Sequence, residues 1–278
     1  MPPIGQIDSH QHFWRLERGD YGWLTPALKP LYRDFGPADL APFLERHGIA
    51  GTVLVQAAAT VAETEFMLGI ATETAFVKGV VGWVDFESAV APAEIDRLAA
   101  HPKLKGFRPM IQDIPDPEWM LCAAIGPAIA RLQHLGLAFD ALVKPPHLAP
   151  LRQFLPLYPE LWVVIDHGAK PDIAHGQFED WAQEMRELAE DPRIYCKISG
   201  LVTEAAPGWG PDDLARFLDL LLETFGPRRL MWGSDWPVVD LAGGYDRWRI
   251  ATLDYLARLG EEERAAILGG TAAEVYRL

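Results

Sequence analysis

Apolar residues along the chain follow two alternating patterns. Short runs rich in β-branched and other apolar residues alternate with longer segments in which apolar residues recur every three or four positions. The first pattern is typical of buried strands and the second of amphipathic helices. The short runs are Ile4 to Asp8, Gly51 to Gln56, Gly79 to Val84, Leu104 to Arg108, Ala138 to Val143, Trp162 to Asp166, Ile194 to Lys197 and Leu230 to Trp232.

The helical pattern is clearest near the end of the chain. Apolar residues from Leu214 to Phe225 share one helical face, and Gly226-Pro227 provides a stop. Shorter helical segments precede Gly48 and the seventh run. Thr271 followed by Glu274 predicts a capping box at the start of a last short helix.

Alternation of strands and helices indicates βαβ units and a parallel sheet. Eight strands in 278 residues favour one closed (β/α)8 TIM barrel, since such barrels typically have about 250 residues. We therefore expect a single domain spanning residues 1–278. A doubly wound open sheet is the main alternative, but no GxGxxG fingerprint follows the first run.

Charge and composition narrow the range of partners. The net charge of -14 would repel nucleic acid and anionic membrane surfaces, so neither is expected to bind. No leader-like segment or long apolar stretch is present in this sequence, which predicts a cytoplasmic protein. Cys122 and Cys196 both lie among apolar residues and are expected to be buried free thiols.

Three groups of polar residues follow strand-like runs. His10 and His12 are two positions apart, so in an extended chain they face the same side and can converge on one ion or one substrate. Asp235 follows the eighth run, and His167 follows the sixth. Because barrel closure makes the first and last strands neighbours, Asp235 is expected to share a site with the histidine pair. His167 could act as a proton carrier or ligand, and the alternative for Asp235 is a helix cap.

Other candidates could bind a substrate at the same barrel mouth. Arg108 and Lys170 are cations near strand ends, and Glu204 follows the seventh run. Trp14 and Trp236 offer flat aromatic faces that suit sugar rings. Each of these side chains has an ordinary alternative, as a rim charge or as part of the core.

The first connection, from Phe13 to about Pro37, is long and rich in Trp, Tyr, Pro and Gly. Long loops inside a compact domain are usually functional or disordered, and the aromatic residues favour an ordered loop. We expect it to cover one mouth of the barrel.

Several motifs together resemble a known family. These motifs are Asp8-Ser9-His10-Gln11-His12-Phe13-Trp14, Val80-Val81-Gly82-Trp83-Val84-Asp85, Asp166-His167-Gly168-Ala169-Lys170-Pro171, Cys196-Lys197-Ile198-Ser199-Gly200-Leu201 and Gly233-Ser234-Asp235-Trp236-Pro237-Val238. With them, the chain resembles the amidohydrolase superfamily nearly end to end, and within it the branch of sugar lactonases that act on lactones of sugars such as L-fucose and L-rhamnose.

The resemblance implies a distorted TIM barrel in which His10, His12 and Asp235 surround a metal position and His167 lies beside it. Metal-dependent members often carry a further histidine ligand on strand five, where this chain has Asp140. The resemblance thus implies a single divalent metal such as Zn²⁺, weakly held or dispensable, rather than two.

The reaction implied is hydrolysis of an aldono-lactone by an activated water, with Asp235 as general base and the histidines and Arg108 polarising the carbonyl. Two alternatives stay open: a zinc-dependent decarboxylase or amidase of the same superfamily, and a non-catalytic barrel that binds a sugar acid. The expected partner is a small sugar lactone, and an oligomer is compatible with the sequence.

Overall fold

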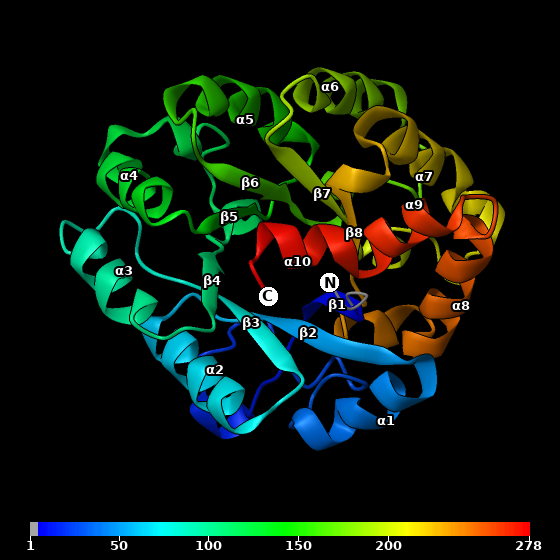
Figure 1. The fold of residues 1–278 in the computed structure, drawn as a ribbon, viewed down its shortest axis with the longest axis horizontal. Coiled ribbons are helices and arrows are strands. Elements are labelled where there is room, and N and C mark those ends of the chain that lie inside the picture. The colour runs from blue at the N-terminus through cyan, green and yellow to red at the C-terminus, as the bar shows by residue number, and fades with distance from the viewer. Residues whose placement is uncertain (1–4) are drawn as a thin grey trace.

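A computed structural model describes residues 5–278, and within them eight parallel strands form a nearly closed barrel in the order β1 to β8 (Figure 1). Each predicted run corresponds to one strand, although Ile4 of the first run lies outside the described residues. The strands are β1 (Gln6–Gln11), β2 (Ile49–Val55), β3 (Val77–Gly82), β4 (Leu104–Phe107), β5 (Ala138–Ala141), β6 (Trp162–Ile165), β7 (Ile194–Ile198) and β8 (Leu230–Trp232). The predicted TIM barrel is confirmed.

The barrel closes between its first and last strands, beyond the end of β8. The backbone N–H of Asp235 donates to the carbonyl of His10 at 2.8 Å, and the N–H of His12 donates to the carbonyl of Trp236 at 2.7 Å. Closure therefore depends on the same segments that carry the predicted site residues.

Helices surround the barrel as an outer ring (Figure 1). Residues on one face of the strands, among them Val53, Val164 and Met231, fill the barrel interior, while the other face packs against the helices. The helices are α1 (Pro37–His47), α2 (Val61–Glu73), α3 (Ala91–Ala99), α4 (Gly126–Leu135), α5 (Leu148–Phe154), α6 (Glu179–Ala189), α7 (Pro211–Phe225), α8 (Gly244–Leu256), α9 (Glu261–Ala265) and α10 (Thr271–Val275).

Helix α7 forms where the apolar period predicts it. Pro211 occupies the first turn, the Asp213 carboxylate accepts from the Gly210 N–H at 2.7 Å, and Gly226 ends the helix with a φ of 68°. Its buried face packs onto the barrel.

The last helix differs from the prediction. Thr271 is the first residue of α10 rather than its cap, because a π-helical turn over residues 266–270 leads directly into α10; the Thr271 hydroxyl instead donates to the Pro227 carbonyl at 3.4 Å. The capping-box prediction is therefore wrong. Helix α10 lies across one end of the barrel (Figure 1), and just beyond it the Tyr276 hydroxyl donates to Asp140 inside the barrel at 2.8 Å.

The two cysteines also differ from each other. Cys196 is a buried free thiol in β7, as predicted, but Cys122 is exposed. The prediction for Cys122 is wrong because this residue lies in the turn between two short 3-10 segments rather than on the buried side of a helix.

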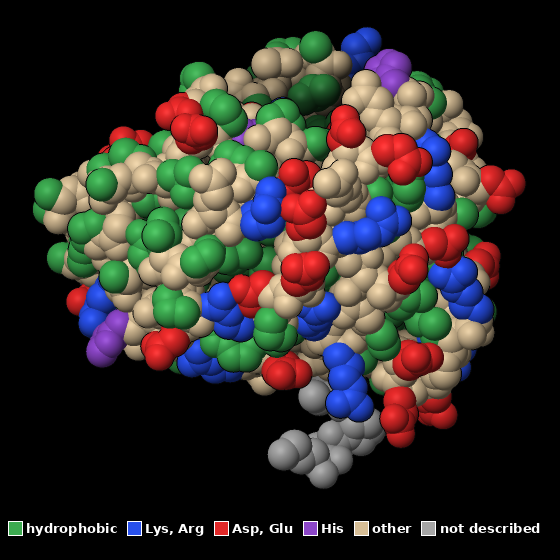
Figure 2. All heavy atoms as spheres, turned by 90° about the horizontal axis from the view of Figure 1, so that it is seen from above, with side chains coloured by type: hydrophobic (Ala, Val, Ile, Leu, Met, Phe, Trp, Pro, Cys, Tyr) green, Lys and Arg blue, Asp and Glu red, His purple; other side chains and the backbone are tan. Residues whose placement is uncertain are grey.

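On the outer surface, acidic and basic side chains are interspersed across the face drawn in Figure 2. Among the helices of residues 5–278, none is long and apolar enough to cross a membrane.

Candidate active site

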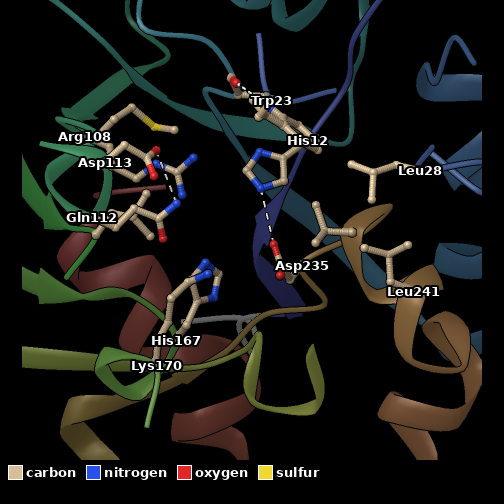
Figure 3. Close-up of a pocket in the computed structure, with 14 residues that line it drawn as sticks. His12, Trp23, Leu28, Arg108, Gln112, Asp113, His167, Lys170, Asp235 and Leu241 are labelled. Atoms are coloured by element: carbon tan, nitrogen blue, oxygen red, sulfur yellow. Dashed lines mark hydrogen bonds and ion pairs between the residues drawn. The ribbon is translucent and has the colours of Figure 1, made fainter. Parts of the chain in front are cut away.

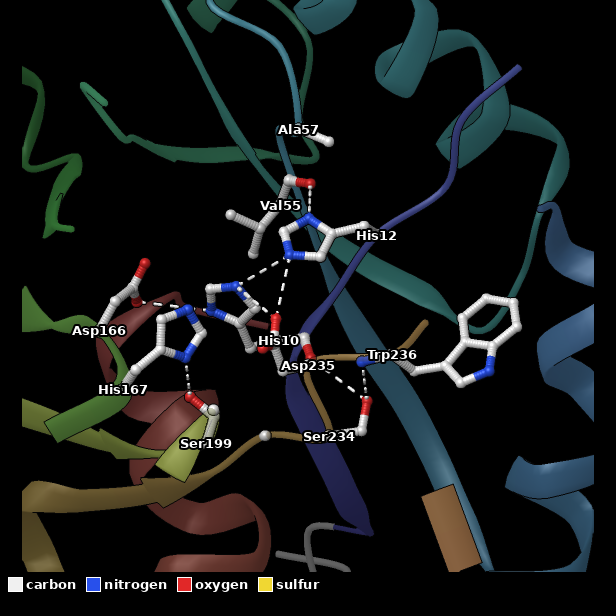
Figure 4. A network of polar contacts seen from close by, with 12 residues as sticks. His10, His12, Val55, Ala57, Asp166, His167, Ser199, Ser234, Asp235 and Trp236 are labelled. Atoms are coloured by element: carbon white, nitrogen blue, oxygen red, sulfur yellow. Dashed lines mark hydrogen bonds and ion pairs between the residues drawn. The ribbon is translucent and has the colours of Figure 1, made fainter. Parts of the chain in front are cut away.

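Four of the predicted polar residues converge with Asp166, which was not predicted, at the ends of the strands (Figure 4). His10 is in β1 and His12 just after it, Asp166 and His167 follow β6, and Asp235 follows β8. All five side chains are buried or nearly so. The barrel thus gathers residues from both ends of the chain into one cluster, as parallel strands ending at one edge require.

The contacts of His12 fix its tautomer. Its Nδ1 lies 2.7 Å from the carbonyl oxygen of Val55, which can only accept, so Nδ1 carries the proton. In this tautomer His12 presents the lone pair of Nε2, which lies 3.3 Å from Asp235 Oδ1 and 3.2 Å from His10 Nε2. Acceptor atoms this close to one another are suited to hold a proton or a cation between them.

His10 is held by charged groups on both sides of its ring. Its Nδ1 lies 3.4 Å from Asp166 Oδ1 and 3.2 Å from Lys197 Nζ, while its Nε2 lies 3.3 Å from Arg108 Nη1. Because burial disfavours the charged ring, the pKa of His10 is lowered well below its ordinary value. His10 is therefore neutral near pH 7.

Asp166 is the anion that balances the cations around His10. It lies 3.0 Å from Lys197 Nζ and 3.2 Å from Arg108 Nη1. Although burial alone would raise the pKa of Asp166, Lys197, His10 and Arg108 together hold it well below its ordinary value. Asp166 is thus a carboxylate at neutral pH.

Asp235 and His167 both occupy strained backbone positions. Their φ angles are 57° and 55°, in the left-handed region that residues other than glycine seldom adopt. The His167 Nδ1 contacts the Ser199 hydroxyl at 2.8 Å, which orients the ring. Burial lowers the pKa of His167 to about 4. Burial would raise the pKa of Asp235, but the neighbouring His167 and the contact with His12 hold it below its ordinary range.

A cavity of about 270 Å³ opens beside this cluster (Figure 3). His12, Arg108, His167, Lys170 and Asp235 line it. The other lining residues are Trp23, Leu28, Ala57, Met110, Gln112, Asp113, Leu142, Val238 and Leu241. Its size and its mixed apolar and polar walls suit a small ligand. The long first connection supplies Trp23 and Leu28, so it contributes a wall of this mouth.

Of the other four residues predicted to bind substrate, one lines the cavity and three do not. Lys170 lines the cavity, and Glu204 lies 3.2 Å from its Nζ, outside the lining. Trp14 and Trp236 are almost fully buried and do not line the cavity. Both rings pack edge-on against Phe35, with centroids 5.2 Å apart in each case. Their indoles therefore have a packing role in the first connection.

Sequence reasoning missed several residues that the structure brings to the site. Asp166 appeared in the sequence only as a neighbour of His167, although its position at the end of a strand was a usable signal. Gln112 and Asp113 lie in the connection after β4, where no motif distinguishes them. Lys197 points into the barrel interior from β7, where its Nζ lies 2.5 Å from Asp140 Oδ2.

The donor atoms fit one divalent metal. His10 Nε2, His12 Nε2 and Asp235 Oδ1 form a group with ligand atoms within 4.8 Å of one another. The Nδ1–H of His12 bound to a carbonyl is the usual support of a metal-binding imidazole. A second group, His10 with Asp166 and His167, is also within reach, but the cations of Lys197 and Arg108 already neutralise Asp166.

Comparison with known proteins identifies the family. The amidohydrolase family model matches residues 7–278, and the chain belongs to this family. A curated L-fucono-1,5-lactonase of Burkholderia ambifaria is 46% identical, covering 98% of this chain and 96% of the relative. Another protein of that name, from Burkholderia multivorans, is 39% identical with the same coverage.

Solved structures agree with this assignment. An amidohydrolase of Burkholderia multivorans, crystallised with bound zinc, has a TM-score of 0.92 and 38% identity, covering 98% of this chain and 99% of that one.

Proposed function

We propose that this protein is a lactonase that opens a sugar-derived aldono-lactone, of the L-fucono-1,5-lactone type, to the sugar acid. The observation that carries the proposal is the cluster of Asp235, His12 and His10, of which Asp235 and His12 line the cavity, in a chain that closely resembles two proteins named L-fucono-1,5-lactonase. A lactone is an activated ester, so a carboxylate base and fixed cations suffice to assist water attack.

In the proposed reaction, Asp235 takes a proton from a water molecule as the water oxygen attacks the lactone carbonyl carbon. Its low pKa keeps it ionised, and hence able to accept the proton, throughout the neutral range. The bond between the carbonyl carbon and the ring oxygen then breaks, and the proton passes from Asp235 to the departing ring oxygen. The product is the open hydroxy acid.

Arg108 and His167 stabilise the negative charge that develops on the carbonyl oxygen. The Arg108 guanidinium lines the cavity and is held by Asp166 and by the backbone carbonyl of Gln56, so it is fixed before the substrate arrives. Lys170 binds substrate hydroxyls from the cavity wall, and Glu204 orients its ammonium.

His10, His12 and Asp235 would hold a single divalent metal, for which Zn²⁺ is our proposal. When bound, such an ion polarises the carbonyl and favours ionisation of water. The Arg108 guanidinium, 3.3 Å from His10 Nε2, competes with a cation for the same atoms, so we propose that the metal is held weakly.

A panel of pentono- and hexono-lactones, followed by acid release at constant pH, tests the proposal. We expect hydrolysis of at least one hexono-1,5-lactone, and loss of roughly 10²–10⁴-fold in kcat for Asp235→Asn. Asp254→Asn, an exposed change on α8, is the matched control and should keep full activity. No hydrolysis of any lactone in the panel, together with measurable binding of a sugar acid, would favour a non-catalytic barrel. Activity on an amide or an aromatic acid that depends strictly on stoichiometric zinc would favour the amidase or decarboxylase alternative.

A further inference from the structure

Two short 3-10 turns give the cavity chemically different walls. The turn after β4, η2 (Ile111–Asp113), contributes Gln112 and Asp113. The turn after β8, η10 (Val238–Ala242), contributes Val238 and Leu241. One turn therefore offers hydrogen-bonding groups, and the other offers only hydrocarbon.

Val238 and Leu241 form one continuous apolar surface. Residues three apart in a 3-10 helix are eclipsed, so these two side chains lie one above the other. Figure 3 shows Leu241 and Leu28 on the Asp235 side of the cavity, opposite Arg108, Gln112 and Asp113. We call Leu28, Val238 and Leu241 the apolar wall.

The apolar wall is only partly covered by the protein itself. Leu241 is 46% exposed, and Leu28 and Val238 are half-buried. Partly exposed apolar side chains that line a cavity gain free energy when a ligand removes them from water. The part of the ligand that contacts them must be apolar, since these side chains offer no hydrogen-bond partner to a hydroxyl group.

The 1,5-lactone of a 6-deoxy sugar carries one apolar substituent, a methyl group. In a 6-deoxy-1,5-lactone, the C6 methyl is attached to C5, and C5 carries the ring oxygen that departs. The bond that breaks joins C1 to this ring oxygen, so the methyl lies on the leaving-group side of the ring, which faces Asp235 in the proposed reaction. The hydroxyls on C2, C3 and C4 occupy the rest of the ring. Those hydroxyls suit the wall formed by Gln112, Asp113 and Lys170.

We infer that the apolar wall is the subsite for the C6 methyl and makes the enzyme select 6-deoxy-aldono-1,5-lactones over lactones that carry a C6 hydroxyl. This inference rests on the proposed lactonase function. An apolar subsite rejects an added hydroxyl only moderately, by about 10–100-fold. Because Leu241 borders solvent, we expect the lower part of that range.

The test compares freshly prepared L-fucono-1,5-lactone with L-galactono-1,5-lactone, which differs only by a hydroxyl on C6. We expect kcat/KM to favour the first by about tenfold or more in the parent protein. Val238→Asn supplies a hydrogen-bond partner at the wall, so the ratio should fall at least about fivefold, mainly through faster turnover of the galactono-lactone. Ile250→Asn places the same side chain on an exposed apolar position of α8, outside the cavity lining, and should leave the ratio unchanged.

The outcomes separate the inference from the proposed function. Equal kcat/KM for the two lactones in the parent protein would overturn the inference and leave the lactonase intact, whereas no hydrolysis of either would overturn the lactonase itself. If the parent protein prefers the fucono-lactone but the ratio of the two kcat/KM values is unchanged in Val238→Asn and in Leu241→Asn, the apolar wall does not cause the selectivity. Leu241→Asn, at the more exposed position, also covers the case in which Val238→Asn does not fold.

Discussion

Lys197 Nζ lies 2.5 Å from Asp140 Oδ2, and both side chains are fully buried inside the barrel. The same ammonium lies 3.0 Å from Asp166 Oδ1 and 3.2 Å from His10 Nδ1. Asp140 occupies the strand-five position that the family resemblance associates with a histidine ligand. The cation beside Asp140 is the Lys197 ammonium. Strand β5 therefore contributes a carboxylate that balances the charge of this lysine.

This ion pair leads to a prediction about stability. Lys197→Met removes the cation beside Asp140 and one of the cations beside Asp166, which should lower the free energy of unfolding by about 3–5 kcal/mol. Adding Asp140→Leu removes one of those carboxylates and should recover part of the loss. Urea denaturation of the parent, both single variants and the double variant measures the coupling. Simple additivity of the two single effects would show that the pair does not interact.

Arg108 leads to a prediction about catalysis. Its guanidinium contacts Asp166 and the Gln56 carbonyl while facing the cavity, and a lysine cannot make both contacts. Arg108→Lys should therefore lower kcat for the lactone by roughly 10²-fold or more with a smaller change in KM. Arg131→Lys, at a surface pair with Asp96, is the control and should not change either constant. A KM effect alone would mean that Arg108 only binds substrate.

The donor set leads to a prediction about metal binding. His12→Ala removes the ligand atom whose tautomer the Val55 carbonyl fixes, so its affinity for Zn²⁺ should fall by more than the roughly 10–100-fold typical of lost supporting contacts. His175→Ala, at an exposed histidine outside the group of ligand atoms, should bind zinc like the parent. Calorimetric titration of metal-free protein gives both affinities, and equal values would exclude His12 as a ligand.

A buried acid on α2 leads to a prediction about pH. Glu63 accepts a hydrogen bond from the Tyr21 hydroxyl at 2.8 Å and lies 3.4 Å from Arg18. Because Tyr21 and Arg18 belong to the first connection, these contacts hold that connection against α2. Burial raises the pKa of Glu63 to about 7. The unfolded chain releases this proton near pH 4.5 while the folded protein retains it, so stability falls as pH rises from about 4.5 to 7.

Glu63→Gln removes that titration. From pH 5 to pH 8, the free energy of unfolding should decrease by about 2–3 kcal/mol less in the variant than in the parent. Glu73→Gln, an exposed change on the same helix, should follow the parent curve. Parallel pH dependences for Glu63→Gln and the parent would contradict a protonated Glu63 in the folded state.

The sequence by itself determined that the chain folds as a barrel and which of its polar residues lie at the ends of the strands. Apolar periodicity is a local property, so eight strands could be placed within a few residues, and α7 could be placed with its stop. Alternation along a strand put His10 and His12 on one face, and closure of an eight-stranded barrel predicted their meeting with Asp235.

Only the tertiary structure decided which neighbours those residues have. His12 and Asp235 are separated by 223 positions, and the contacts of Lys197 with Asp140 and His10 are equally non-local, so no sequence pattern encodes their geometry. Trp14 was recognisable as an aromatic side chain near a strand end, but whether its ring faced a ligand or a loop depended on how the first connection packs. Side-chain direction and burial depend on the whole fold, which is why the walls of the cavity emerged only from the structure.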